Sequence, residues 1–458
     1  MDCDELVISL LFPPSDYVSG INAFKRILNN KKPVDILQAK SEIANTNFDV
    51  FNRYINDRLF LDVDLEFDTP SSIFKSLSDA REVLQKDYAK IYSRSWLANN
   101  HFIALDYKLS KPDVYWCAEF SDPLILNIIN RVRNKKGFFI SNPSYVDYVN
   151  GHILELNEKN NVEFPLIEDG ASVFFLAEYL TYLFADEIIF TNENQRNAML
   201  NQFSSDVREF VLKKSIIEMH PTLDEEFYHI ESVELDLDDD YINMAYFGKD
   251  YYGIRHFESL FYSIESLNHK FKDKIRIYLF MEEVSLIKRL VSSFNSRDSF
   301  IVKKPLDYFE FLNATTKFDV LIVNDVITKG LWSANPFLPS KISDYLGSSR
   351  DIWAFYEKGS TLSKFNLKYM SDMADFGECR NQLINILEDY GFKDDNYSFN
   401  EDYFIQRLTT LNRLFDTEFK RNSRLIAENK SLKKLNSDIL SSNSWKLTRP
   451  LRDIRNKK

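Results

Sequence analysis

Short, continuous apolar runs alternate with stretches of helical period, and this alternation constrains the fold more than any other feature of the sequence. Such runs lie at 6–12, 34–37, 114–118, 188–190, 242–247, 275–280, 300–302, 318–323 and 352–355. Continuous apolar runs are typical of strands that are buried on both faces, as in parallel sheets. The helical stretches would cover those faces, so the sequence predicts an α/β fold with parallel strands. The long region 48–109 has few glycines and helical spacing, which predicts covering helices.

Length and charge bound the organisation of the chain. With 458 residues, 44% of them hydrophobic, the chain can bury more than one core, and the length favours two or three domains. The net charge of −12 argues against a general nucleic-acid binder. An acidic run at 234–240 is typical of a solvated linker. We therefore expect domains at 1–232 and 241–395, followed by a helical extension at 400–458.

Cysteine spacing and the N-terminus indicate the compartment. Cys3, Cys117 and Cys379 lie far apart, without the paired spacing of a disulfide framework or a zinc site. The first five residues are acidic where a signal peptide would be basic, and no apolar run is long enough to cross a bilayer. These features predict a cytoplasmic protein without a metal site, whose contact with a membrane would be peripheral.

A candidate anion-binding site lies at 335–347. A proline, a serine and a lysine stand there before a short amphipathic helix. Free backbone N–H groups, the Ser340 hydroxyl and the Lys341 ammonium would then point the same way. An ordinary capped helix packed on a sheet has the same local chemistry, so both interpretations stay open at this point.

A second candidate lies at the start of the second half. A predicted strand ends at Gly248, and Lys249 and Arg255 border the loop before an amphipathic helix. A strand, a glycine loop and a basic residue at a helix start make a pyrophosphate seat. Single basic residues at helix starts are usually surface charges. The pairing of Arg255 with Ser340 and Lys341 is what favours a binding site.

The first half offers acidic and small residues. Ser19 and Gly20 lie in a polar turn at the mouth of a predicted helix, where a glycine lets a ligand approach the backbone or simply makes the turn. Glu119 and Asp122 follow an apolar strand, whose carboxyl end faces the ligand crevice of a parallel sheet. Either is a candidate for binding an acceptor hydroxyl or taking its proton. Asp122 also fits a helix cap, and His220 fits either a turn or a ligand contact.

Several of these motifs, in this order, resemble one enzyme family. The segment 338–347 resembles the donor-site helix of GT-B glycosyltransferases of family 4, in the subgroup where Pro-Ser-Lys-Leu-x-Asp/Glu-Tyr-Leu precedes a turn and a strand. The Thr-Asn pair at 191–192 and the His-Pro pair at 220–221 resemble the same family, whereas the usual proline is missing at 349–351. The likeness covers roughly 6–387. It implies two Rossmann-like domains facing a cleft, with the C-terminal helical extension added.

The resemblance also implies a chemistry. The donor would be a nucleotide-sugar, transferred with retention of configuration and without a cofactor or metal. Donor contacts would come from Gly248, Lys249, Arg255, Ser340, Lys341 and Asp344, with a nearby N-terminal loop containing Ser19 and Gly20. Many members use two glutamates eight positions apart. Asp344 matches the second of these and Pro336 occupies the place of the first, which leaves the donor geometry open.

The C-terminal segment differs in character. Apolar residues at heptad spacing in 402–440 give a weak coiled-coil pattern, which fits self-association or a helix that packs back on the first domain. Trp445 through Lys458 form a basic segment that suits an anionic membrane surface, although a solvated tail is the alternative. The stretch 444–452 also resembles a segment of bacterial cell-surface polysaccharide glycosyltransferases.

These observations predict a glycosyltransferase of bacterial capsule or O-antigen assembly. It would move a sugar from a nucleotide-sugar to a lipid-linked glycan acceptor at the inner face of the cell membrane. The main alternative is a non-catalytic GT-B-like subunit that binds glycan or scaffolds a complex. A sugar-nucleotide epimerase on the same fold would need clustered acidic groups at the donor, which the sequence does not reveal.

Overall fold

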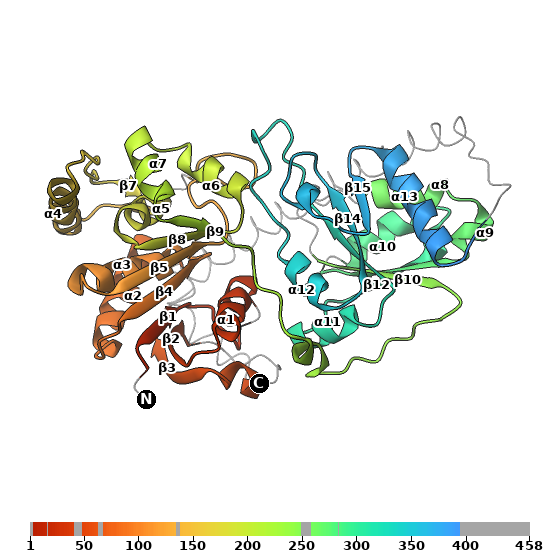
Figure 1. Cartoon of the computed structure of the whole chain (residues 1–458), viewed down its shortest axis with the longest axis horizontal. Coiled ribbons are helices and arrows are strands. Elements are labelled where there is room, and N and C mark those ends of the chain that lie inside the picture. Colours follow the sequence, from red (N-terminus) through yellow and green to blue (C-terminus); the bar gives the residue numbers. More distant parts are fainter. Residues whose placement is uncertain are drawn as a thin grey trace, which may run out of the picture.

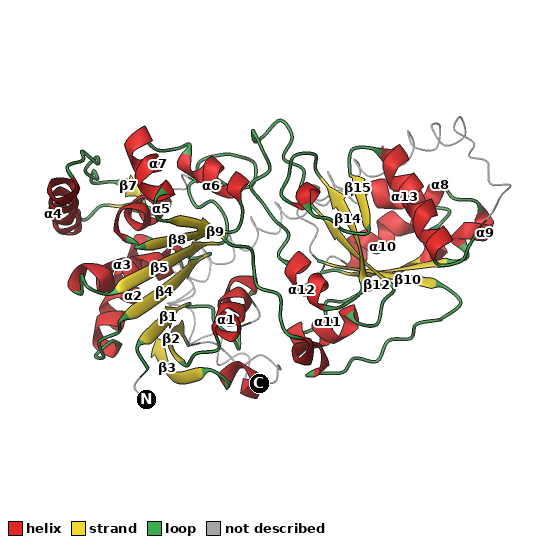
Figure 2. Cartoon of the chain, viewed as in Figure 1, coloured by secondary structure: helices red, strands yellow, loops and turns green. Residues whose placement is uncertain are grey.

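The computed structural model describes residues 3–15, 17–40, 48–62, 67–133, 138–248, 258–282 and 284–393. These residues form two parallel sheets that lie beside one another along the long axis of the molecule (Figure 1, Figure 2). The predicted α/β class is confirmed. The predicted helical extension at 400–458 lies outside the described residues.

The first sheet occupies the N-terminal half. Within the described chain it has seven strands in the order β3-β2-β1-β4-β5-β8-β9, all parallel. Their bounds are Glu5–Ile8 (β1), Val34–Ala39 (β2), Ile55–Leu61 (β3), Lys90–Ser95 (β4), Tyr115–Phe120 (β5), Glu187–Phe190 (β8) and Ser215–Ile217 (β9). A small antiparallel pair, β6 (Phe139–Ile140) and β7 (Ala171–Ser172), lies apart from it.

Helices cover this sheet. They are Val18–Asn30 (α1), Pro70–Val83 (α2), Ala98–Ser110 (α3), Pro143–Asn160 (α4), Val173–Phe184 (α5), Glu193–Leu200 (α6) and Ser205–Leu212 (α7). The prediction that 48–109 is helical was wrong for β3 and β4. Strand β4 was not predicted because Ser93, Arg94 and Ser95 interrupt its apolar run, although all three residues are buried in the structure.

The second sheet has six parallel strands in the described part of the C-terminal half, in the order β12-β11-β10-β13-β14-β15. They are Ile242–Phe247 (β10), Ile275–Phe280 (β11), Phe300–Lys303 (β12), Val320–Asn324 (β13), Asp351–Tyr356 (β14) and Tyr369–Asp372 (β15). The accompanying helices are Glu258–Ser266 (α8), His269–Lys272 (α9), Val284–Ser292 (α10), Tyr308–Thr315 (α11), Lys341–Gly347 (α12) and Phe376–Asp389 (α13).

Both sheets have the strand order of a Rossmann fold. In each one the first strand is central, the next two lie on one side, and the fourth strand lies on the other side. The chain therefore changes direction between β1 and β4 and again between β10 and β13. Ligands of such sheets bind beyond the carboxyl ends of the strands at this switch point.

Hydrophobic packing joins the two halves. One cluster of buried residues belongs to the first half and a second one to the second half. A third cluster, the shared core, contains residues from both, including Phe24, Phe51, Phe309 and Tyr345. The rings of Phe51 and Phe309 meet across the halves with centroids 5.1 Å apart. Helices α1, α11 and α12 lie between the sheets in Figure 1, where this core forms.

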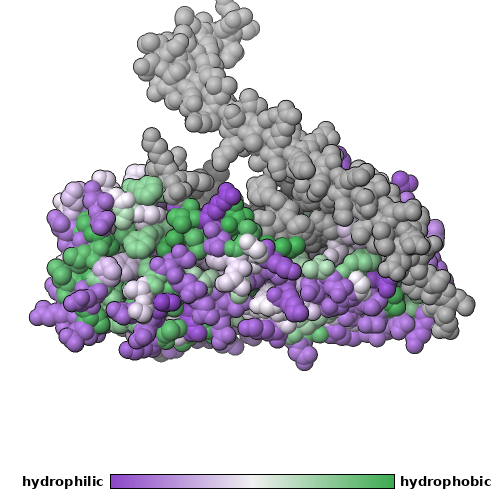
Figure 3. Space-filling view, turned by 90° about the horizontal axis from the view of Figure 1, so that it is seen from above, coloured by the Kyte–Doolittle hydropathy of each residue, from purple (hydrophilic) through white to green (hydrophobic). Residues whose placement is uncertain are grey.

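The outer surface is less uniform than the core. On the face seen in Figure 3, apolar side chains gather over the first half, whereas the visible part of the second half is more polar. No helix in the described ranges is long and apolar enough to cross a membrane.

Candidate functional site

The carboxyl ends of the two sheets border one interface. The loop that follows β13 reaches the first half, where the Trp332 indole N–H donates to the Ile128 carbonyl at 2.8 Å. The Asn192 amide, just after β8, donates to the Pro336 carbonyl at 3.1 Å. Loops from the ligand-binding edges of both sheets therefore contact one another, and the candidate site lies among them.

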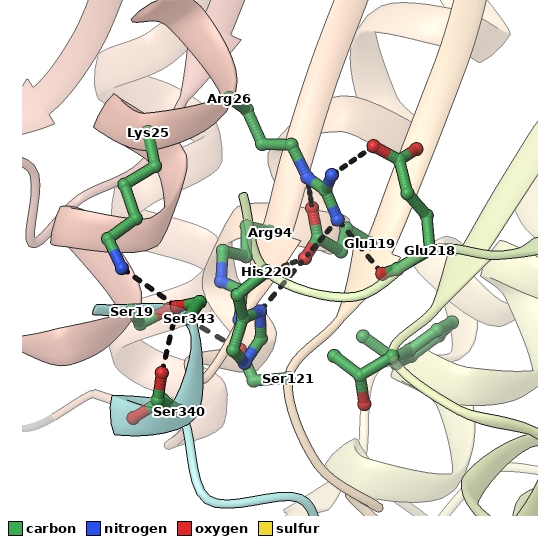
Figure 4. A network of polar contacts seen from close by, with 12 residues as sticks. Ser19, Lys25, Arg26, Arg94, Glu119, Ser121, Glu218, His220, Ser340 and Ser343 are labelled. Carbon is green, nitrogen blue, oxygen red and sulfur yellow. Dashed lines mark hydrogen bonds and ion pairs between the residues drawn. The ribbon is translucent and has the colours of Figure 1, made fainter. Parts of the chain in front are cut away.

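A buried group of charges closes the edge of the first sheet. Glu119, the fifth residue of β5, is fully buried and accepts hydrogen bonds from Arg26 Nε at 2.9 Å and from the Tyr92 hydroxyl at 2.6 Å. Arg94 on β4 forms an ion pair with the same carboxylate. Arg26 also contacts the Glu218 carboxylate and donates to its carbonyl at 3.0 Å. We call these five residues the charge cluster; Figure 4 shows Arg26 and Arg94 directed at Glu119.

His220 lies against this cluster. Its Nδ1 is 3.9 Å from a carboxylate oxygen of Glu119 and has no hydrogen-bond partner within the described chain. Burial, reinforced by Arg94, Lys25 and Arg26, lowers the pKa of His220 well below its usual value. The imidazole is therefore neutral at physiological pH. His220 was predicted as either a turn residue or a ligand contact, and the structure buries it at the crossing between the halves.

A second set of polar contacts ties the halves together. Lys25 on α1 forms a buried ion pair with Asp344 on α12 at 2.5 Å, and its ammonium also donates to Ser343 Oγ at 3.0 Å. Tyr308 donates to the same carboxylate oxygen, Oδ1, at 3.1 Å. We call Lys25, Tyr308, Ser343 and Asp344 the interdomain clamp. The other oxygen of Asp344, Oδ2, accepts no hydrogen bond within the described chain.

The N-terminal turn lies close to the clamp. Gly20 is on the first turn of α1, and a Cβ at this position would clash with the carbonyl of Leu11. Ser19 Oγ and Ser121 Oγ share a hydrogen bond of 3.5 Å, shown in Figure 4. Asp122 follows Ser121, is half-buried, and acts electrostatically on Arg94. The structure thus brings Ser19, Gly20 and Asp122 to one edge.

The structure describes some of the predicted donor residues of the second half but not all of them. Ser340 precedes α12 and does not cap it with its side chain. Lys341 begins the helix, is half-buried, and places its Nζ 5.0 Å from the ring centroid of Phe311. Gly248 directly follows β10. Lys249 and Arg255 lie outside the described residues.

Two buried polar side chains at strand ends were not singled out by the sequence. Asn324 ends β13, and neither its Oδ1 nor its Nδ2 has a hydrogen-bond partner in the described ranges. Ser95 ends β4, and its Oγ also has no partner there. Buried polar atoms normally find partners, so unsatisfied ones at a ligand-binding edge are available to a ligand. For Asn324 the available signal was a polar residue that closes an otherwise apolar strand. Strand β4 gives no such signal, because Ser93 and Arg94, which precede Ser95, are also polar.

Sequence reasoning also missed the cations that organise the edge. Lys25 and Arg26 lie on the buried face of α1, between the apolar residues Phe24 and Ile27. Two adjacent cations within an apolar helical stripe indicate buried ion pairs, and this signal was present in the sequence. In the part of the chain that the structure describes, no three His, Cys, Asp or Glu side chains are grouped to hold a metal ion.

No protein-family model and no curated protein matches the sequence. Solved structures do match. Sucrose-phosphate synthase from Thermosynechococcus elongatus has a TM-score of 0.54 at 12% identity, covering 94% of this chain and 100% of that chain. Anabaena HepE in complex with UDP and glucose has a TM-score of 0.50 at 10% identity, with coverages of 92% and 100%. OtsA has a TM-score of 0.50 at 11% identity, with coverages of 92% and 96%.

These likenesses concern the fold, since the identities are low. The three structures share the GT-B fold. Together with two Rossmann-like sheets whose carboxyl ends face one interface, they show that this chain has the GT-B fold.

Proposed function

We propose that this protein is a glycosyltransferase that moves a sugar from a nucleotide-sugar donor to a glycan acceptor. The observation that carries the proposal is the meeting of two Rossmann-type carboxyl edges, with unsatisfied polar side chains at the ends of β4 and β13. The donor binds to the second half and the acceptor to the first. The likeness in fold to HepE, whose structure contains UDP and glucose, supports a nucleotide-sugar as donor.

The donor diphosphate is assigned to the second half. Its negative charge grows as the glycosidic bond breaks, and a hydroxyl, an ammonium and backbone N–H groups stabilise that charge. Ser340, Lys341 and Gly248 are the described residues proposed for this role, with Lys249 and Arg255 as further candidates. No resident cofactor or metal enters the proposal, and retention of configuration is part of it.

Asp344 is proposed to serve two purposes. Its Oδ1 is held by Lys25 and Tyr308, so the carboxylate helps to join the halves. A carboxylate has about four lone-pair sites, which leaves Oδ2 able to accept a hydroxyl of the donor. Donor binding and closure of the two halves would then depend on the same side chain.

The two acidic candidates of the first half are given different roles. Glu119 is fully buried and is held by Arg26, Tyr92 and Arg94, so we assign it to positioning these side chains. Asp122 is half-buried, and we propose it as the group that binds or deprotonates the acceptor hydroxyl. The greater exposure of Asp122 supports this choice, because a base must reach the proton that it takes.

The wider setting is proposed from the sequence resemblance. A lipid-linked acceptor and a role in bacterial surface-polysaccharide assembly would place the enzyme at the inner face of the cell membrane. The segments proposed for membrane contact (445–458) and self-association (402–440) lie outside the described residues. Their removal, followed by measurement of liposome binding and mass in solution, tests both.

The alternative is a non-catalytic GT-B-like subunit. Its support is that Pro336 stands where a glutamate is expected and that Lys25 pairs with the carboxylate of Asp344. A subunit of this kind would bind glycan or nucleotide-sugar without transferring the sugar. Turnover of the bound donor therefore separates the two functions.

The decisive experiment is a calorimetric titration of the protein with UDP, GDP, dTDP and CMP and with their common sugars. A ligand that binds the native state also raises thermal stability, which gives an independent readout. We expect saturable binding of one nucleotide, weakened at least tenfold by Lys341→Ala. The matched control is Lys304→Ala, which removes an exposed cation of the same half. Absence of binding by every nucleotide would overturn the proposed function.

A further inference from the structure

Two aromatic side chains stand exposed beside the candidate site. Tyr17 is the residue before α1 and Trp96 is the residue after β4, and they are 48% and 46% exposed. Their ring centroids are 5.3 Å apart and their planes are tilted by 34°. The neighbouring Val18 is also exposed. We call Tyr17 and Trp96 the aromatic platform.

The exposure of Trp96 is unusual for this chain. The other tryptophans in the described ranges, Trp116, Trp332 and Trp353, are all buried. Within the described ranges, neither the Tyr17 hydroxyl nor the Trp96 indole N–H has a hydrogen-bond partner. Tyrosine and tryptophan usually form such a bond when they become covered, so both groups are available to donate to a ligand. Two rings that remain side by side in solvent form an amphipathic surface with free donors.

The backbone that carries the platform is braced. Leu10 N–H, on the loop after β1, donates to Asn100 on α3 at 3.1 Å, and the Asn100 amide donates to the Arg94 carbonyl at 2.7 Å. Asp68 accepts the Ala98 N–H at 2.7 Å, which fixes the start of α3. The loops of β1 and β4 are therefore tied to one helix, and preorganised surfaces lose less entropy on binding.

The platform is continuous with the acceptor edge. Trp96 follows Ser95, whose carbonyl accepts the Ser121 N–H at 3.1 Å, and Asp122 is the next residue. On the other side, Tyr17 is two residues from Ser19, which is hydrogen-bonded to Ser121 Oγ. The two rings thus lie beside Ser19 and Ser121 and near Asp122, the carboxylate proposed to bind the acceptor hydroxyl.

We propose that the aromatic platform binds a pyranose ring of the acceptor glycan. One face of such a ring presents C–H groups and is apolar, while its edge carries hydroxyls. The aromatic rings fit the apolar face of the sugar. The unpaired O–H and N–H donors of the platform, together with Ser19 and Ser121, fit the hydroxyls at its edge. An acceptor sugar is favoured over the donor sugar because Asp122, the carboxylate proposed for the acceptor, follows Ser121, whereas the residues proposed for the donor diphosphate lie in the second half. This inference rests on the proposed function for the identity of the sugar as acceptor.

The test uses the full-length protein labelled with 5-fluorotryptophan, which gives one fluorine resonance for each of its five tryptophans. The Trp96 resonance is identified by its loss in Trp96→Phe. Cellobiose, maltose, lactose and chitobiose are titrated in turn. We expect at least one disaccharide to shift the Trp96 resonance, and Tyr17→Ala to weaken its binding about tenfold, as loss of an aromatic contact predicts.

Matched variants make the result specific. Trp96→Ala should weaken disaccharide binding at least as much as Tyr17→Ala, as measured by calorimetry, whereas Trp96→Phe should retain most of it. Tyr148→Ala, which removes another exposed aromatic residue of the same half, should change nothing. All platform variants should bind the nucleotide of the donor with the affinity of the wild type, because they leave the second half intact.

The outcomes separate this inference from the proposed function. Failure of every disaccharide to shift the Trp96 resonance overturns the platform, even when a nucleotide binds. A shift produced by phosphatidylethanolamine and phosphatidylglycerol vesicles but by none of the sugars also overturns it, in favour of a lipid surface. Disaccharide binding at Trp96 in a protein that binds no nucleotide supports the platform and overturns the transferase.

Discussion

At the edge of the first sheet, Arg26 and Arg94 are buried against Glu119, whereas the ends of β10 and β11 in the second sheet pack through aromatic rings. Phe247 and Phe280 end neighbouring strands there and stack with centroids 4.6 Å apart. Ion pairs are directional, and a buried charge is costly once its partner is lost. Apolar packing tolerates changes that keep volume. The comparison teaches that one topology supports buried ion pairs at the strand ends of one half and apolar ring packing at strand ends of the other.

The largest expected effect comes from breaking the charge cluster. Glu119→Ala leaves two buried arginines without their shared carboxylate, so the free energy of unfolding should fall by about 3–5 kcal/mol. Urea unfolding measures it. Glu218→Ala is the control, because that carboxylate is 43% exposed and its pair should contribute about 1 kcal/mol or less.

The stacked rings at the ends of β10 and β11 provide the comparison for this test. Phe247→Leu keeps most of the volume and should cost about 1.5 kcal/mol or less. If Phe247→Leu destabilises the protein as much as Glu119→Ala does, the proposed difference between the two edges is wrong.

The interdomain clamp should show the next largest effect. Lys25→Met removes one partner of a buried ion pair, and we expect a loss of about 3 kcal/mol. Adding Asp344→Asn removes the uncompensated charge, so the double variant should be more stable than the sum of the single losses predicts. Unfolding free energies of the four proteins in this cycle give the coupling. Strict additivity would show that the pair does not join the halves energetically.

Acid should weaken the first half through its buried histidines. Burial lowers the pKa of His101 from 6.5 to about 3, so the folded protein keeps this side chain neutral while the unfolded chain takes up a proton. The contribution of His101 is present above pH 6.5 and is lost as the pH falls toward 3. At pH 5 the loss should be about 2 kcal/mol, since each pKa unit corresponds to about 1.4 kcal/mol.

A variant isolates this effect from opposing groups. Burial raises the pKa of Glu178 from 4.5 to about 7, and its contribution has the opposite sign: it is present below pH 4.5 and lost as the pH rises through 7. His101→Gln can still hydrogen-bond to Ser93 but does not titrate. We expect the stability of this variant to fall less between pH 7.5 and 5 than that of the wild type. If the free energy of unfolding falls as much between pH 7.5 and 5 in His101→Gln as in the wild type, the lowered pKa of His101 is contradicted.

The smallest effect on stability is expected at Asn324. Both polar atoms of this buried side chain lack partners within the described chain, so Asn324→Ala should change the free energy of unfolding by about 1 kcal/mol or less, in either direction. Binding of the donor nucleotide should nevertheless weaken, which calorimetry measures. A matched change, Asn313→Ala, removes an amide whose oxygen and nitrogen are both hydrogen-bonded and should destabilise the protein more. Wild-type affinity in Asn324→Ala would exclude a role in the site.

The sequence by itself determined the class of fold and most strands of the second half. Apolar runs at 242–247 and 275–280 coincide with β10 and β11, because strands buried on both faces need continuous apolar side chains. The motif at 338–347 marked α12, and Gly248 marked the end of β10. These features depend on residues that are close in the sequence, so the sequence alone is enough to predict them.

Only the tertiary structure decided which charged residues pair at the polar edge of the first half. Strand β4 was missed because an arginine such as Arg94 is normally expected at the surface. Its burial depends on the ion pair with Glu119 on the neighbouring strand. Lys25 and Asp344 lie in different halves of the sequence, and neither residue indicates the other until α1 and α12 meet. A buried charge is tolerated only where folding brings its partner to it. The partner is therefore a property of the fold, not of the local sequence.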